Sequence, residues 1–266
     1  MTAFMSAVLD GNRIEILSDG ASYTSDGYVT AFGTKVSQIP NFMAAQMTRG
    51  DVEMGGVLRQ IVQDIFALAK SFDQGIDLLQ GVTIGEARAP WEDPVQLVIW
   101  GISETRGPMT YWFATTDVHN GDGRWNLMST DRDFCQGEAC EWPPAYLASG
   151  TLADKAVYLM QGLRKESHLD LVTGERHPGS DHPIVGGHID LTTITAEGVS
   201  QRRLHTWPDR VGERMVRDPS TVDVGSRIAS DAGLRALANA LEDVKVPARS
   251  RHQRRALEAS GRKRAA

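Results

Sequence analysis

Residues 2–35 read TAFMSAVLDGNRIEILSDGASYTSDGYVTAFGTK, and this stretch decides the fold. Asp10-Gly11 favours a tight turn, because both residue types tolerate the positive φ that a two-residue hairpin requires. The residues from Phe4 to Leu9 are mostly apolar, and Ile14, Ile16 and Leu17 follow the turn. The pattern predicts two antiparallel strands, one of them buried on both faces.

The predicted hairpin brings the start of the chain next to Asp19. If Asp10 and Gly11 are the central turn residues, cross-strand partners have numbers that sum to 21, so Thr2 lies opposite Asp19. After removal of the initiator methionine, Thr2 carries an α-amine with an ordinary pKa of about 7.7 to 8.0, which can accept its own hydroxyl proton. Lys35 would lower that pKa further, and Asp19 would orient the lysine. Thr2, Asp19 and Lys35 are therefore the candidate catalytic residues.

The order of motifs around these residues resembles a known family. Ser18-Asp19-Gly20-Ala21 is followed by a polar turn, by Gly33-Thr34-Lys35-Val36 and by a long helical pattern, and GGHIDLTTI occupies residues 186–194. This order resembles the N-terminal nucleophile (Ntn) hydrolases of the proteasome β-subunit type, well over residues 2–70 and more loosely to about residue 205. In that family the nucleophile is a terminal threonine, supported by an aspartate and a lysine sixteen residues apart, and Asp19 and Lys35 match that pair.

The resemblance implies an α+β fold, namely a four-layer αββα sandwich of antiparallel sheets over residues 1–207. A C-terminal extension with one helix is expected at residues 208–246, and residues 247–266 form a basic tail that we expect to be disordered. The implied activity is that of a threonine peptidase or amidase, which cleaves a peptide or a small amide through an ester intermediate. Because proteasome relatives stack into rings, the resemblance also implies a homo-oligomer.

A second hypothesis is a catalytically inactive, proteasome-like assembly or partner-binding protein, with some similarity to proteins of phage or mobile-element origin. A strict count back from Asp19 and Lys35 puts Ala3 at the nucleophile position, unless the hairpin is longer by one residue. The Ala-Gly turn that supplies the family's oxyanion donor reads Gln46 to Gly50 in this chain. Both departures favour this alternative.

The remaining periodicity predicts helices packed on sheets and several further hairpins. The helix signals are a Thr48–Asp51 capping pattern before an apolar stripe from Val57 to Ala69, a weaker segment from Phe72 to Leu79 ended by Gly81, an amphipathic segment from Leu152 to Arg164, and a last helix at 228–241. The predicted later strands are residues 21–24, 28–32, 35–39, 95–102, 110–115, 189–195 and 200–207, with a turn at Asp26-Gly27.

Composition and charge predict a globular protein in the cytoplasm. The chain has 266 residues with 41% hydrophobic content, enough for one large domain with a tail. No apolar run approaches the roughly eighteen residues that span a bilayer, and no export signal precedes the first strand, so no membrane contact is expected. The net charge of −6 combines +6 from Arg249 onward with −12 on the rest, which predicts a polyanion contact of the tail, a contact with the acidic body, or solubility alone.

No cofactor and no metal site is predicted. The densest ligand-like cluster contains His168, His177, His182, His188, Asp181 and Asp190, but its spacing fits no zinc signature. The acidic residues of the irregular segment 117–144 lack EF-hand spacing, and this long loop is a candidate substrate rim or subunit contact. Cys135 and Cys140 are interpreted as two reduced thiols, with a disulfide or half a zinc site as alternatives.

Overall fold

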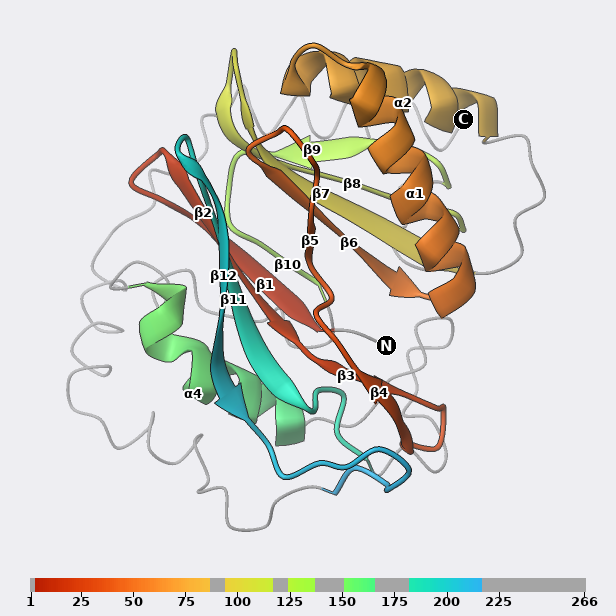
Figure 1. Ribbon diagram of the computed structural model, residues 1–266, viewed down its shortest axis with the longest axis vertical. Helices are drawn as coiled ribbons and strands as arrows, with labels where there is room; N and C mark the ends of the chain where they lie inside the picture. The colour runs from red at the N-terminus through yellow and green to blue at the C-terminus, as the bar shows by residue number, and fades with distance from the viewer. Residues whose placement is uncertain (1–2, 87–93, 117–123, 137–150, 166–181, 217–266) are drawn as a thin grey trace, which may run out of the picture. The chain divides into compact units, whose positions relative to one another are not determined.

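The computed structural model describes residues 3–86, 94–116, 124–136, 151–165 and 182–216 (Figure 1). Their strands form two five-stranded antiparallel sheets and a separate hairpin. The first sheet has the order β10 (Phe134–Gln136), β1 (Phe4–Leu9), β2 (Arg13–Asp19), β11 (His188–Thr195) and β12 (Gly198–Thr206). The second has the order β5 (Ser37–Gln38), β6 (Ala44–Gly50), β7 (Val95–Ser103), β8 (Gly107–Ala114) and β9 (Met128–Thr130). The hairpin joins β3 (Ala21–Tyr23) to β4 (Val29–Phe32).

The hairpin of β1 and β2 has the predicted turn but not the predicted register. Asp10 and Gly11 both have positive φ, 53° and 66°, and the Asn12 amide donates to the Leu9 carbonyl at 3.2 Å. Pairing resumes with Leu9 opposite Arg13, so Asn12 is an extra residue and partner numbers sum to 22. The predicted sum of 21 is wrong because this one extra residue shifts every later pair.

The other predicted strands in the described residues are present with shifted ends. The expectation that residues 117–144 are irregular is wrong, because β9 and β10 lie in this segment and pair with β8 and β1. The turn at Asp26-Gly27 is found between β3 and β4, with a φ of 87° at Gly27. The predicted strand 35–39 is reduced to the two residues of β5, and β6 runs as far as Gly50. Gly50 has a φ of 111°, and a Cβ there would lie 2.0 Å from the Pro94 carbonyl oxygen, so the close approach of Pro94 at this strand end requires glycine.

Three helices are described: α1 (Val52–Leu68), α2 (Phe72–Glu86) and α4 (Leu152–Lys165). Asp51 caps α1 and accepts the Met54 amide at 2.8 Å. Thr48 lies in β6, so the prediction that Thr48 belongs to the cap is wrong. The predicted end of α2 at Gly81 is also wrong, because the helix continues to Glu86. A helical glycine costs about 1 kcal/mol relative to alanine, which the burial of Phe72, Ile76 and Leu79 outweighs.

Three clusters of buried side chains connect the elements. Helices α1 and α2 pack on the second sheet through a cluster that includes Leu58, Val62, Phe66, Leu79 and Leu97. Helix α4 lies against the first sheet (Figure 1). It packs there through Ala156, Leu159 and Leu163, against Leu17 and Leu191. The third cluster joins the two sheets through residues that include Phe4, Ile14, Ile16, Met47 and Trp100. Strand β2 is therefore buried on both faces, as predicted for one arm of the hairpin.

These observations confirm the α+β class with antiparallel sheets. Residues 208–216 contact the rest of the described chain: Arg164 Nη1 donates to Asp209 Oδ2 at 2.9 Å, and the Met215 amide donates to the Gly27 carbonyl at 2.9 Å. The predicted helix at 228–241 and the basic tail lie outside the described residues, and the domain boundaries stay predictions. Within the described segments, every helix is too short or too polar to cross a membrane.

Candidate active site at Asp19 and Lys35

The fold brings Asp19 and Lys35 into direct contact. Asp19 ends β2, and Lys35 lies in the connection between β4 and β5. The ammonium Nζ of Lys35 donates to Oδ1 of Asp19 at 2.7 Å. The side chain of Asp19 is fully buried and that of Lys35 is 12% exposed, so the ion pair lies just below the surface.

The second carboxylate oxygen of Asp19 is held by the backbone. Oδ2 accepts the amides of Ala21 and Gly186, both at 3.3 Å. The Gly186 carbonyl in turn accepts the amide of Gly20 at 3.1 Å, which ties the end of β2 to the residues before β11. Because amide donors and an ammonium surround it, the carboxylate is fixed in one orientation.

Burial changes the protonation of the lysine. Desolvation lowers the pKa of Lys35 from its ordinary 10.5, while the charge and the hydrogen bond of Asp19 raise it and offset part of that shift. A cation held in this way can lower the pKa of a neighbouring amine and stabilise an anion that develops beside it. The pair therefore has the electrostatics expected of a catalytic support.

The nucleophile candidate, Thr2, lies outside the described residues. Phe4 pairs with Ser18, and continuing this register by one residue sets Ala3 opposite Asp19. Ala3 is buried, with 3% exposure. The predicted pairing of Thr2 with Asp19 is therefore wrong by one residue, because Asn12 lengthens the turn.

A second polar cluster, formed by Thr34, His188, Asp190 and Arg203, lies beside the ion pair, and of these only His188 and Asp190 were considered from the sequence, as possible metal ligands. Asp190 Oδ2 accepts the Thr34 hydroxyl at 3.3 Å and lies 3.1 Å from Nε2 of His188. Asp190 Oδ1 accepts Nε of Arg203 at 3.1 Å. Thr34 and Asp190 both belong to motifs quoted for the resemblance, but they are 156 residues apart, so no local pattern could have joined them.

Gly186 and Gly187 allow the surrounding segments to meet. A Cβ on Gly187, which has a φ of 73°, would lie 2.7 Å from the ring of Phe32 and 3.2 Å from the Ala21 nitrogen. The Gly187 amide donates to Asp209 at 2.7 Å, and Asp209 pairs with the buried Arg164 of α4. The pair of Arg164 and Asp209 was missed, since nothing near Arg164 in the sequence identifies its partner.

The segment expected to match the family's oxyanion turn is not a turn. Gln46 to Gly50 belong to β6 and pair with β7 along that length. Gln46 is fully buried, and its side-chain amide donates to the Arg59 carbonyl at 3.2 Å. This part of the chain therefore does not reproduce the oxyanion arrangement that the resemblance implies.

The histidine cluster considered for a metal is dispersed where it is described. His182 contacts the carbonyl oxygens of Pro183 and Ser25, at 2.9 and 3.2 Å, whereas His188 contacts Asp190. In the described part of the chain, no three His, Cys, Asp or Glu side chains form a group that could hold a metal ion. The other predicted members, Asp181, His168 and His177, lie outside the described residues, as does Cys140.

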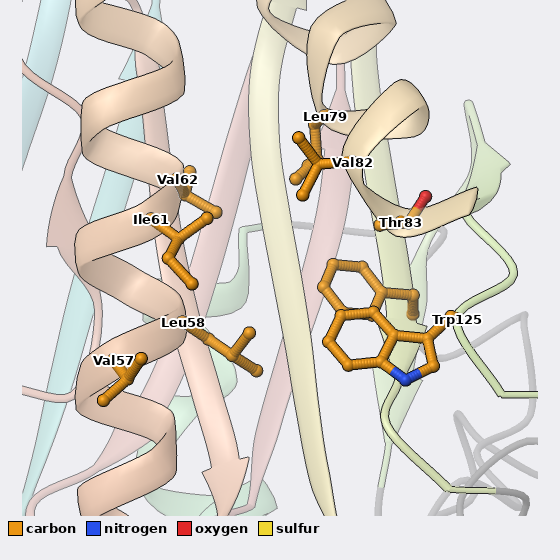
Figure 2. A pocket seen from close by; sticks show the side chains of 9 residues that line it. Val57, Leu58, Ile61, Val62, Leu79, Val82, Thr83 and Trp125 are labelled. Carbon is orange, nitrogen blue, oxygen red and sulfur yellow. The ribbon is translucent and has the colours of Figure 1, made fainter. Parts of the chain in front are cut away.

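An apolar cavity of about 150 Å³ lies between α1 and α2, and Figure 2 shows the side chains that line it. Its lining contains Val57, Leu58, Ile61 and Val62 of α1, Leu79, Val82 and Thr83 of α2, and Phe113 and Trp125. The Thr83 hydroxyl donates to the Gln80 carbonyl at 3.0 Å within its own helix. With no titratable side chain in this lining, the cavity offers no acid, base or nucleophile for a reaction.

Comparisons with known proteins assign no family to the chain. No protein-family model matches it, and no curated protein is significantly similar to it. The functional assignment therefore depends on the geometry described above and on the motif resemblance.

Proposed function

We propose that this protein is a proteasome-like N-terminal threonine amidohydrolase, with Thr2 as nucleophile and with Asp19 and Lys35 as its support. The buried ion pair between Asp19 and Lys35, 2.7 Å long, carries the proposal. The two residues that the motif pattern pairs form a buried ion pair at the end of β2, the strand next to the N-terminal strand β1. The proposed architecture is the four-layer sandwich α1/α2, second sheet, first sheet and α4.

Each residue has a defined task in the proposed reaction. The α-amine of Thr2 takes the proton from its own hydroxyl, and the hydroxyl oxygen attacks the carbonyl carbon of a peptide or small amide. The amine then donates a proton to the leaving nitrogen, which leaves an ester on Thr2 that water hydrolyses. Lys35 keeps the pKa of the amine low by charge repulsion, and Asp19 holds Lys35 in place.

The register of β1 supports the second candidate, a non-catalytic assembly or partner-binding protein. Extending the β1–β2 register by one residue beyond Phe4 and Ser18 sets Ala3, which has no nucleophile, opposite Asp19, and β6 does not form the expected oxyanion turn. A proteasome-like homo-oligomer is proposed under both candidates. Light scattering would then give a mass that is a multiple of 29.1 kDa, and a monomer would contradict assembly.

A covalent inhibitor distinguishes the two candidates. The purified full chain is incubated with a β-lactone that acylates terminal threonine, and the modified peptide is located by mass spectrometry. The hydrolase predicts loss of Met1 and an adduct on Thr2, which Thr2→Ala abolishes and which Lys35→Met slows about a hundredfold, since a positioned catalytic group contributes on that order. Thr30→Ala, at an exposed position of β4, is the matched control. A retained Met1, or equal labelling of Thr2→Ala, would exclude the hydrolase.

A further inference from the structure

The segment that carries Lys35 is held by contacts outside the regular sheets. Residues 33–36 lie between β4 and β5, where no strand is formed. The Gly33 amide donates to the Gly20 carbonyl at 2.9 Å, and the Val36 carbonyl accepts Nε2 of Gln201 at 3.4 Å. Between these two backbone contacts, the Thr34 hydroxyl donates to Asp190 at 3.3 Å. Thr34 is therefore the one residue of 33–36 whose side chain connects this segment to β11 among the contacts described.

Asp190 is suited to hold that segment because it is buried and fixed by other groups. Its exposure is 3%, and Nε of Arg203 donates to Oδ1 at 3.1 Å. Nε2 of His188 lies 3.1 Å from Oδ2 and 2.9 Å from Nη2 of Arg203, so the three side chains form one network. A carboxylate with such partners has little freedom to follow a moving loop, and it holds the Thr34 hydroxyl in a fixed place.

The same network also reaches the residue after Asp19. The imidazole of His188 lies against the backbone of Gly20, where a Cβ would come within 2.1 Å of Cε1. His188 is 3% exposed, so the ring is packed in this position. The Asp190 network thus contacts the neighbour of Asp19 on one side and the neighbour of Lys35 on the other.

We propose that Asp190 is a positioning residue for the candidate active site, and that it holds Lys35 against Asp19 through the hydroxyl of Thr34. The catalytic role of Asp190 rests on the proposed function, but the contact between Thr34 and Asp190 can be tested without an activity measurement. Asp190 does not touch the ion pair and acts through Thr34 and His188. Asp19 pairs with Lys35. The charged or titratable groups that contact Asp190 are His188 and Arg203.

The test measures how readily the Lys35 amine reacts in the full chain. Trace acetylation with acetic anhydride is carried out from pH 7 to 11, and the label on Lys35 is quantified by mass spectrometry relative to Lys70, an exposed lysine. Thr34→Val removes the hydroxyl at constant shape, Thr34→Ser retains it, and Thr30→Val is the control on β4. Asp190→Asn removes the charge of the acceptor.

Thr34→Val is expected to increase Lys35 labelling relative to Lys70 by about threefold, because a hydroxyl–carboxylate contact of 3.3 Å is longer than the usual O–H···O hydrogen bond and contributes at the low end of the range. Asp190→Asn is expected to increase it in the same direction, whereas Thr34→Ser and Thr30→Val keep the wild-type profile. Equal Lys35 profiles in Thr34→Val and wild type would overturn the proposal. So would a parallel increase at Lys155 of α4, because that result means general loosening.

The labelling result and the inhibitor result are independent. If the β-lactone does not modify Thr2, the hydrolase proposal fails, while a selective gain of label at Lys35 in Thr34→Val still supports the positioning role. If Thr2 is modified but Thr34→Val and wild type give the same Lys35 profile, the positioning role fails and the hydrolase remains. In an active protein, Thr34→Val also slows acylation of Thr2, and Thr34→Ser restores the rate.

Discussion

At the scale of single residues, the ion pair of Asp19 and Lys35 combines two opposing effects. Removing a lysine from water disfavours its charged form, and a carboxylate 2.7 Å away restores part of the loss. Breaking such a pair by removing one partner leaves an uncompensated buried charge, which costs more than the pair itself contributes. The pair is therefore better explained by a local function than by overall stability.

The lowered pKa of Lys35 predicts a pH dependence of stability. In the window between that lowered pKa and 10.5, the unfolded chain binds more protons at this lysine than the folded chain. The free energy of unfolding contributed by Lys35 therefore rises with pH across this window. Urea unfolding of wild type and Lys35→Met at pH 7, 9 and 10.5 tests this pH dependence, because the variant has no titrating group at position 35. A difference between the two proteins that stays constant with pH contradicts the prediction.

At the scale of elements, the start of α1 depends on a single side chain. Asp51 lies in an extended conformation, with φ −60° and ψ 134°, and its carboxylate accepts the Met54 amide. The negative charge also meets the positive end of the helix dipole. Thr48 belongs to the preceding strand β6. The Thr48–Asp51 capping pattern therefore predicted the helix correctly but assigned Thr48 to its cap wrongly.

Asp51→Ala is predicted to lower the free energy of unfolding by about 1 kcal/mol, the usual cost of removing an N-cap. The loss arises because the Met54 amide loses its acceptor at the first turn. Thermal and urea unfolding measure it. Asp51→Asn, which keeps an acceptor at the cap, is the matched control and should lose less than half as much. Equal loss in both variants would show that charge, and not capping, is responsible.

The turn of the β1–β2 hairpin could be predicted from the sequence, but its register could not. The dipeptide Asp10-Gly11 forms the turn, as its tolerance of positive φ predicts. The extra residue Asn12 was not predictable, because the turn residues specify the reversal and not the number of residues before pairing resumes. Strand β2 pairs with β11 on one side and with β1 on the other, from Phe4 opposite Ser18 to Leu9 opposite Arg13.

At the scale of the whole molecule, charge is distributed unevenly along the chain. The last eighteen residues, from Arg249, carry a net +6, and the remainder carries −12. A basic segment of this kind can bind polyanions by releasing counterions, so its affinity falls steeply as salt rises.

Deletion of the residues after Pro247 is predicted to abolish retention on heparin at low salt, because the remaining chain has a strong negative charge. The measurement is the salt concentration that elutes the full chain and the truncated chain. Replacing the seven Lys and Arg of the tail with Gln at full length is the control, and it should reproduce the deletion. Retention of the truncated chain would place the polyanion contact elsewhere.

The sequence alone predicted the three described helices and most of the hairpins, through local turn chemistry and periodicity. The antiparallel α+β class and the spacing of Asp19 and Lys35 came from the resemblance, which depends on motifs that can be read in order along the chain. The tertiary structure decided the register at Ala3, the strand at Gln46, and the meeting of Thr34 with Asp190 and of Arg164 with Asp209. Such contacts join residues far apart in sequence, and they form only when sheets and helices bury their apolar faces together, so no local pattern encodes them.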